Sequence, residues 1–380
     1  MQIAVLTNEF EPVIIGGLGI VATRLAEAMQ ARGHELLVIT KGTSREVSDR
    51  RQGGMRVIRF PRESEYHSPV HQRLYAGPIL HYLRGLRERP DIIHVHSIQA
   101  DELATAMRDR YSSQIIYTCH SLVSKEGLHR STSLHMETRQ RHFMEQADAI
   151  VSPSNWQALV LMAQFPAARG KTYVVPNGVK SQSISTLHRP RHKEQLLFAG
   201  RLIRQKGVSE TIAAIADLKN IDRHVRLDII GKGSSHYVRE LRALTNRLNL
   251  SGHVRFLGQC SHHNVLRRMR DAGAVVMPSR NESFGLVALE AMATGTPLVS
   301  TQAGGLRDFV DAETAAVIAS STPEAISKAV AQVWTKKERT ERRQHAAFER
   351  AMHYTWDAVA SQYEAVMDGT ANPYSPTHNV

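Results

Sequence analysis

The sequence predicts an α/β fold with two domains, each built on a doubly wound parallel sheet, which face each other across a cleft. Its 380 residues are too many for one ordinary domain. Short apolar runs alternate with helical stretches along most of the chain, as in parallel strands joined by helices. The alternation stops once, after the turn Pro176-Asn177-Gly178, where a polar stretch follows. A ligand site is expected where the carboxyl ends of the strands meet.

The first predicted domain covers residues 1–178. It opens with a strand at 3–7 and a loop that contains Pro12. Gly16-Gly17-Leu18-Gly19 then begins a helix over 20–32, which carries apolar side chains on one face and ends at Gly33. Further strands are expected at 35–40, 55–60, 92–96, 114–119, 149–152 and 172–175, and further helices at 79–89, 100–110, 134–146 and 155–165.

The rest of the chain repeats the same alternation after a linker. The polar residues 179–194 are predicted to be that linker, and residues 195–352 the second domain. A helix at 353–370 is predicted to cross back to the first domain, and 371–380 to form a disordered tail. In the second domain strands are expected at 195–199, 226–230, 254–257, 274–277 and 298–300, and helices at 208–218, 237–248, 262–270 and 287–293, with mostly helical structure from 323 to 367.

The composition limits the class of protein and its partners. A chain that is 42% hydrophobic and 22% charged is globular, and its net charge of +12 predicts an anionic partner. The basic residues are scattered among few aromatics, so no nucleic acid is expected. Cys119 and Cys260 each border an apolar run, which indicates buried thiols in a reducing compartment. The start lacks a signal peptide and no apolar run has membrane length, so the prediction is a cytoplasmic protein.

Two carboxylates, Glu282 and Glu290, stand eight positions apart in the stretch 277–301. Glu282 precedes a helix N-terminus, where backbone N–H groups point outward, and Glu290 lies two turns further on. In a fully helical span they would be about 12 Å apart, a separation that suits the hydroxyls of both rings of a nucleotide sugar. The alternative is that both are surface acids on an amphipathic helix.

Two cations follow the strand predicted at 195–199. Arg201 and Lys206 are placed to grip a diphosphate and to stabilise the charge that it gains as a leaving group. Gly16 and Gly17 begin a helix and suit an anion-binding loop, with a simple tight turn as the alternative. They match a dinucleotide fingerprint only weakly, because the glycines lie far beyond the strand end.

The run Ser283-Phe284-Gly285-Leu286 between the two glutamates resembles the retaining glycosyltransferases of GT-B fold known as family 4, with their E-x7-E motif. Gly200-Arg201 with Lys206-Gly207, and Gly304-Gly305, resemble further motifs of that family. The resemblance implies a GT-B architecture of two Rossmann-like domains and a metal-independent, retaining hexosyltransferase. The donor is expected to be a UDP-hexose or a UDP-N-acetylhexosamine, and the acceptor a small polyol, a saccharide or a glycolipid.

The same resemblance implies roles for individual residues. Glu282, His120, Arg201 and Lys206 are the expected catalytic residues. His120 follows the strand at 114–119 and would contact the donor sugar; a capping or core histidine is the alternative. The expected donor-binding residues are Gly16, Gly17, Arg201, Lys206, Ser283, Phe284, Gly285, Leu286 and Glu290.

No metal or cofactor is expected. The sequence lacks Asp-x-Asp, the motif with which another glycosyltransferase fold holds a divalent ion. The histidine pairs His67/His71 and His262/His263 are not spaced with Cys or carboxylates as zinc ligands are.

Other interpretations stay open at this point. A glucan synthase or a phosphorylase-like enzyme would share the fold, and an NAD-dependent oxidoreductase or a basic non-enzymatic binding protein would belong to other classes. The basic stretch 130–141 lies near the apolar residues Leu134, Met136, Phe143 and Met144, and predicts peripheral contact with an anionic membrane. A solvated helix face is the competing interpretation.

Overall fold

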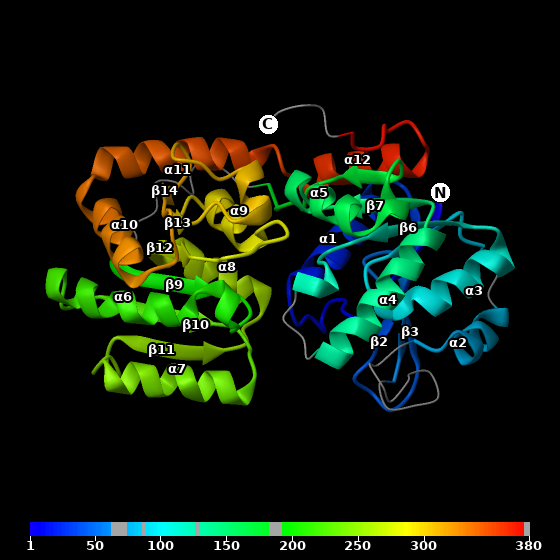
Figure 1. The fold of residues 1–380 in the computed structure, drawn as a ribbon. Coiled ribbons are helices and arrows are strands. Elements are labelled where there is room, and N and C mark those ends of the chain that lie inside the picture. Colours follow the sequence, from blue (N-terminus) through cyan, green and yellow to red (C-terminus); the bar gives the residue numbers. More distant parts are fainter. Residues whose placement is uncertain (62–73, 86–88, 126–129, 182–191, 376–380) are drawn as a thin grey trace. The chain divides into compact units, whose positions relative to one another are not determined.

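The computed structural model describes residues 1–61, 74–85, 89–125, 130–181 and 192–375. The chain divides into two compact units. Unit 1 consists of Met1–Gly178 and Trp356–Val380, and unit 2 is Val179–Thr355. Each unit is an α/β body with its own sheet, and Figure 1 follows the chain through both. The predicted fold class of two parallel-sheet α/β domains is therefore confirmed.

Unit 1 is built on an eight-stranded sheet. Its strands are β1 (Gln2–Leu6), β2 (Glu35–Lys41), β3 (Ser48–Gln52), β4 (Met55–Phe60), β5 (Ile92–Val95), β6 (Gln114–Thr118), β7 (Ala149–Ser152) and β8 (Thr172–Val174). They lie in the order β3-β4-β2-β1-β5-β6-β7-β8, and every neighbouring pair is parallel except β3 with β4. The sequence did not predict β3, because its residues SDRRQ are polar throughout and largely exposed, as suits the edge of a sheet.

Helices cover both faces of this sheet. They are α1 (Gly17–Ala31), α2 (Ala76–Tyr82), α3 (Asp101–Tyr111), α4 (Arg130–Gln146), α5 (Asn155–Gln164) and α12 (Trp356–Met367). One core contains Leu25 of α1 and Tyr363 of α12, and the other contains Leu103 of α3 and Phe143 of α4. The helix at the end of the chain thus completes one face of unit 1.

The apolar side of α4 faces the core rather than a membrane. Met136, Phe143 and Met144 are buried, and only Leu134 of the predicted docking set is exposed, at 68%. Arg139 forms an ion pair with Asp101 of α3. The helix therefore does not expose the apolar surface on which the prediction of peripheral membrane contact was based. No helix of the described ranges is both long and apolar enough to cross a bilayer.

The predicted disordered tail is partly ordered. The backbone N–H of Tyr374 donates to the carbonyl oxygen of Thr172 at 2.6 Å, and the Tyr374 side chain packs against a core of unit 1. Ala371 packs against the other core. The prediction was wrong for 371–375 because one aromatic ring and one backbone hydrogen bond tie this segment to the start of β8. Residues 376–380 lie outside the described residues.

Unit 2 has a six-stranded parallel sheet in the order β11-β10-β9-β12-β13-β14. Its strands are β9 (His192–Ala199), β10 (Arg226–Ile230), β11 (Val254–Gly258), β12 (Ala272–Met277), β13 (Leu298–Ser300) and β14 (Ala316–Val317). The first strand begins at His192, inside the segment predicted as a linker. Its opening residues are polar and partly exposed, so the apolar pattern starts later than the strand.

The helices of unit 2 form two layers. They are α6 (Val208–Ile221), α7 (Ser235–Arg247), α8 (His262–Asp271), α9 (Leu286–Ala293), α10 (Pro323–Thr335) and α11 (Lys337–Met352). Residues of α6, α7 and α10 build one core, and residues of α8, α9 and α11 build the other. The unit is thus doubly wound, as predicted.

Candidate active site

The topology of unit 2 directs attention to the ends of two central strands. The chain runs outward from β9 through β10 to β11, then returns to β12 on the other side of β9. In such sheets ligands bind beyond the carboxyl ends of the strands, where the winding changes direction. Arg201 and Lys206 follow β9, and Glu282 follows β12. The predicted cations and the first predicted carboxylate therefore follow the two strands that border the switch point.

Glu282 and Lys206 form a close ion pair. Lys206 Nζ lies 2.6 Å from Glu282 Oε1, and the two side chains are 16% and 12% exposed. The hydroxyl of Ser279 donates to the same carboxylate oxygen at 2.8 Å. Lys206 is positioned by Gly207, whose φ of 72° is left-handed and whose missing side chain leaves room for Pro278. The carboxylate is thus oriented by an ammonium and a hydroxyl before any ligand binds.

A glycine pair fixes the backbone at Glu282. The N–H of Gly305 donates to the carbonyl oxygen of Glu282 at 2.9 Å. Gly304 has φ +62°, and a Cβ there would lie 2.2 Å from that same oxygen. Only glycine permits this approach, which gives the predicted Gly304-Gly305 loop a physical role in holding Glu282.

The residues after Glu282 lead into α9. Gly285 caps the helix with φ +105°, and a Cβ on it would lie 2.3 Å from Leu306 Cδ2. Phe284 is 3% exposed, and its ring centroid lies 4.9 Å from that of Phe309 and 6.3 Å from that of Tyr354. The Phe284 side chain therefore packs in the core of unit 2. The donor contact predicted from the sequence would have to be made by the backbone of Phe284.

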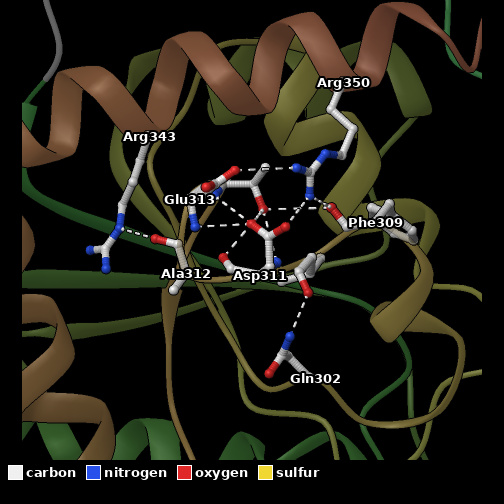
Figure 2. A network of polar contacts seen from close by, with 9 residues as sticks. Gln302, Phe309, Asp311, Ala312, Glu313, Arg343 and Arg350 are labelled. Atoms are coloured by element: carbon white, nitrogen blue, oxygen red, sulfur yellow. Dashed lines mark hydrogen bonds and ion pairs between the residues drawn. The ribbon is translucent and has the colours of Figure 1, made fainter. Parts of the chain in front are cut away.

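A polar network anchors the segment against which Phe284 packs (Figure 2). Arg350 of α11 contacts Asp311 Oδ2 at 2.5 Å and donates to the carbonyl oxygen of Phe309 at 3.2 Å. The Arg350 guanidinium and backbone N–H groups lower the pKa of Asp311 against the opposing effect of burial. Arg343 donates to the carbonyl oxygen of Ala312 at 3.0 Å. Helix α11 thereby supports the loop that backs the Glu282 segment.

Glu290 lies inside α9 with a partner that the sequence did not indicate. Its side chain is 7% exposed, and His262 Nε2 lies 2.6 Å from its Oε1. His262 is the first residue of α8 and is 17% exposed. Surface acids on an amphipathic helix were the alternative for the glutamate pair, and the burial of both carboxylates argues against that alternative.

Arg201 precedes Leu202, which lines a pocket of about 360 Å³ at the ends of β9, β10 and β11. Arg201 is exposed, and within the described ranges no acidic side chain pairs with it. Gly231 reaches φ +148°, and a Cβ there would lie 1.8 Å from the carbonyl oxygen of Gly200, so the two strand ends are in backbone contact. The pocket lining includes Leu202, Gly231, Lys232, Arg242, Phe256 and Gln259. Its cationic and aromatic side chains suit a planar anionic ligand.

The glycine loop of unit 1 already holds an anion, and that anion belongs to the chain. Glu9 Oε2 accepts hydrogen bonds from the backbone N–H groups of Ile15 at 2.8 Å and Gly16 at 2.9 Å. The helix α1 begins at Gly17, as the sequence predicted for a loop of this kind. The N–H group of Gly16 is therefore committed to an internal carboxylate rather than left open for a ligand.

His120 belongs to a histidine cluster at the ends of β5 and β6. His96 Nδ1 lies 2.9 Å from His120 Nε2, and the rings of His94 and His96 are 4.1 Å apart. Burial lowers the pKa of His94 to about 3 and of His120 to about 4, and lowers that of His96 well below its usual range. These histidines are therefore neutral near pH 7, so His120 offers a neutral donor or acceptor rather than a charge.

Comparisons with known proteins agree with this arrangement. A family model described as "Glycosyl transferases group 1" matches residues 180–350, and one described as "Glycosyltransferase Family 4" matches residues 15–183. Glycogen synthase of Mycobacterium tuberculosis is 30% identical over 95% of this chain and 93% of its own. The chain belongs to the family 4 glycosyltransferases.

Two further similarities concern other members and the fold. D-inositol 3-phosphate glycosyltransferase of Corynebacterium diphtheriae is 28% identical over 94% of this chain and 90% of its own. The solved structure of Anabaena HepE in complex with UDP-glucose superposes with a TM-score of 0.76 at 19% identity, covering 97% of this chain and all of that one. The GT-B fold is thus shown, and glycosyl transfer replaces the oxidoreductase alternative.

Two partners of the predicted glutamates were not predicted from the sequence. Ser279 bonds Glu282, and His262 bonds Glu290. In the sequence His262 stands out only as part of a histidine pair, and the described residues contain no cluster suited to a metal ion. The places of Ser279 and His262 in the sequence were the only indication of a role, because each residue lies shortly after the end of a strand.

Proposed function

We propose that this glycosyltransferase moves a hexose or N-acetylhexosamine from a UDP-sugar to an acceptor hydroxyl with retention at the anomeric carbon. The observation that carries the proposal is the Lys206–Glu282 ion pair at the switch point of unit 2, with Arg201 exposed nearby. Such a site offers positive charge for a diphosphate and a fixed carboxylate for sugar hydroxyls. The UDP-glucose complex of HepE supports a uridine nucleotide.

In the proposed reaction the bond from the anomeric carbon to the β-phosphate oxygen breaks, and a bond to the acceptor oxygen forms on the same face. The departing phosphate takes the acceptor proton. Arg201 and Lys206 stabilise the negative charge on the diphosphate, and Glu282 orients the sugar ring. His120 contacts the sugar as a neutral group. No metal ion is required in this proposal, since the two cations supply the positive charge.

Two classes of acceptor are candidates. The similarity to D-inositol 3-phosphate glycosyltransferases favours a phosphorylated small polyol, which agrees with the net charge of +12. The similarity to glycogen synthase favours a glucan, which would make the chain a glucan synthase. The cytoplasmic location and a glycolipid acceptor at the membrane remain predictions.

The test is a UDP-release assay with UDP-glucose, UDP-galactose and UDP-N-acetylglucosamine, each paired with inositol 3-phosphate or glycogen. We expect turnover with one UDP-sugar and one acceptor. The proton coupling at the anomeric carbon of the product, measured by NMR, reports its configuration. A product of inverted configuration, or turnover with ADP- or GDP-sugars alone, would contradict the proposed donor chemistry.

A further inference from the structure

Glu290 is a buried carboxylate in an otherwise apolar helix. The sequence of α9 is LVALEAMA, and the residues beside Glu290, Leu289 and Ala291, are completely buried. A buried carboxylate without a partner loses its hydration and tends to take up a proton. Within the described ranges the partner of the Glu290 side chain is His262, at 2.6 Å. His262 therefore supplies a hydrogen-bond partner to a carboxylate that its helix surrounds with apolar residues.

The two oxygens of the Glu290 carboxylate differ. Oε1 is bonded to His262 Nε2. Oε2 has no hydrogen-bond partner in the described part of the chain, and it is absent from the buried polar atoms that lack one. It therefore reaches solvent. A carboxylate held at one oxygen and open at the other is pre-oriented to accept a hydrogen bond from a ligand hydroxyl.

His262 also connects this carboxylate to the pocket. Gly258 and Gln259 line the pocket at the end of β11, and the chain reaches His262 three residues later, where α8 begins. Ser261 caps α8 by accepting a hydrogen bond from the N–H of Asn264 at 3.4 Å, which fixes the place of His262 on the first turn. The pocket wall and the Glu290 partner thus belong to one continuous segment.

We propose that His262 is a positioning residue that holds Glu290 for the ribose hydroxyls of the donor nucleotide. This inference rests on the proposed function, since it assumes that Glu290 binds the nucleotide. His262 fixes Oε1, so Oε2 is directed at the ligand without rotamer freedom. Because the ribose is remote from the bond that breaks, the contact contributes equally to the ground state and the transition state.

The chain offers a matched control in the next residue. His263 is exposed and has no partner among the described residues, so His263→Leu changes the same residue type one position away. His262→Leu removes the donor to Oε1. His262→Gln keeps an N–H donor on a side chain of similar reach and should restore much of the function.

The experiment first titrates the wild-type protein with UDP, ADP and GDP by calorimetry, and then titrates the variants with the nucleotide that binds most tightly. We expect His262→Leu to weaken binding about tenfold, His262→Gln to weaken it less than threefold, and His263→Leu to leave it unchanged. In steady-state kinetics His262→Leu should raise the donor KM with kcat nearly constant. Thermal melts check that each variant is folded.

A double-mutant cycle with Glu290→Gln tests whether His262 acts through Glu290. If it does, His262→Leu should add little to the loss already caused by Glu290→Gln. Equal affinity in His262→Leu and His263→Leu, or additive losses in the cycle, would overturn the inference. Should no nucleoside diphosphate bind the wild-type protein, the proposed function itself would fail, which is a different result from either of these.

Discussion

Glu282→Gln should affect catalysis and nucleotide binding in opposite directions. The substitution keeps the size of the side chain and removes the charge that lies 2.6 Å from Lys206 Nζ. In the free enzyme Glu282 competes with any diphosphate for this ammonium. The glutamine should therefore release Lys206 toward phosphate, while the sugar loses a contact near its reacting carbon.

The structure sets the size of both effects. A hydrogen bond to a charged group contributes about 1.5–3 kcal/mol, and the low exposure of both partners places this pair within that range. The Gln carbonyl still accepts from Lys206, so we expect roughly the lower bound to be released, and UDP to bind about tenfold more tightly. We expect kcat to fall by at least about tenfold, because the lost contact belongs to the reacting ring.

Calorimetry with UDP and initial-rate kinetics with the UDP-sugar would measure the two effects. Glu290→Gln is the matched comparison, since it removes the other buried carboxylate of the same loop and helix. We expect it to weaken UDP binding and to raise the donor KM with little change in kcat. If Glu282→Gln and Glu290→Gln weaken UDP binding by similar factors, Glu282 does not compete with phosphate for Lys206 and the reasoning is wrong.

Three other predictions follow from the described geometry. Arg201→Ala and Lys206→Ala should each weaken UDP binding about tenfold or more, and unchanged calorimetric affinity in both would remove them from the diphosphate site. Turnover should persist in EDTA, whereas its loss and recovery with magnesium or manganese would show that the two cations are insufficient. Burial, with a smaller contribution from His120, lowers the pKa of His94 to about 3, against about 6.5 in an unfolded chain. Between these values the unfolded state binds more protons, so the free energy of unfolding should fall as pH is lowered from 6.5. The free energy of unfolding, measured with urea at several pH values, should depend less steeply on pH between 6.5 and 5 in His94→Gln, by up to about 1.4 kcal/mol per pH unit. An unchanged slope would contradict a neutral, buried His94.

Most strands were predictable because a strand covered on both faces is a short apolar run, and both sheets consist largely of such strands. The strand β3 escaped prediction for the opposite reason, since an edge strand is free to be polar. The start of β9 at His192 also escaped prediction, because its first residues are polar and exposed. The sequence therefore predicts the interior of each sheet better than its margins.

The candidate site was predictable where its residues share a local motif. Glu282, Lys206 and the Gly304-Gly305 loop each follow a strand end, and the parallel sheet brings those ends together. The partner of Glu290 was not predictable, because His262 stands 28 positions away and no periodicity connects a helix start with the middle of another helix. The buried ring of Phe284 was also missed, since a motif does not reveal which side chains serve packing.

The last helix of the chain has a consequence for synthesis on the ribosome. Tyr363 of α12 is buried in unit 1, where its hydroxyl lies 2.9 Å from that of Thr118, and Arg32 pairs with Glu364 at 2.7 Å. Unit 2 is translated in full before these residues emerge. Unit 2 is therefore able to fold while one core of unit 1 still lacks its last helix. This differs from the usual order of folding during synthesis, in which the N-terminal domain folds first. A nascent chain arrested before Trp356 would present that uncovered apolar face to chaperones.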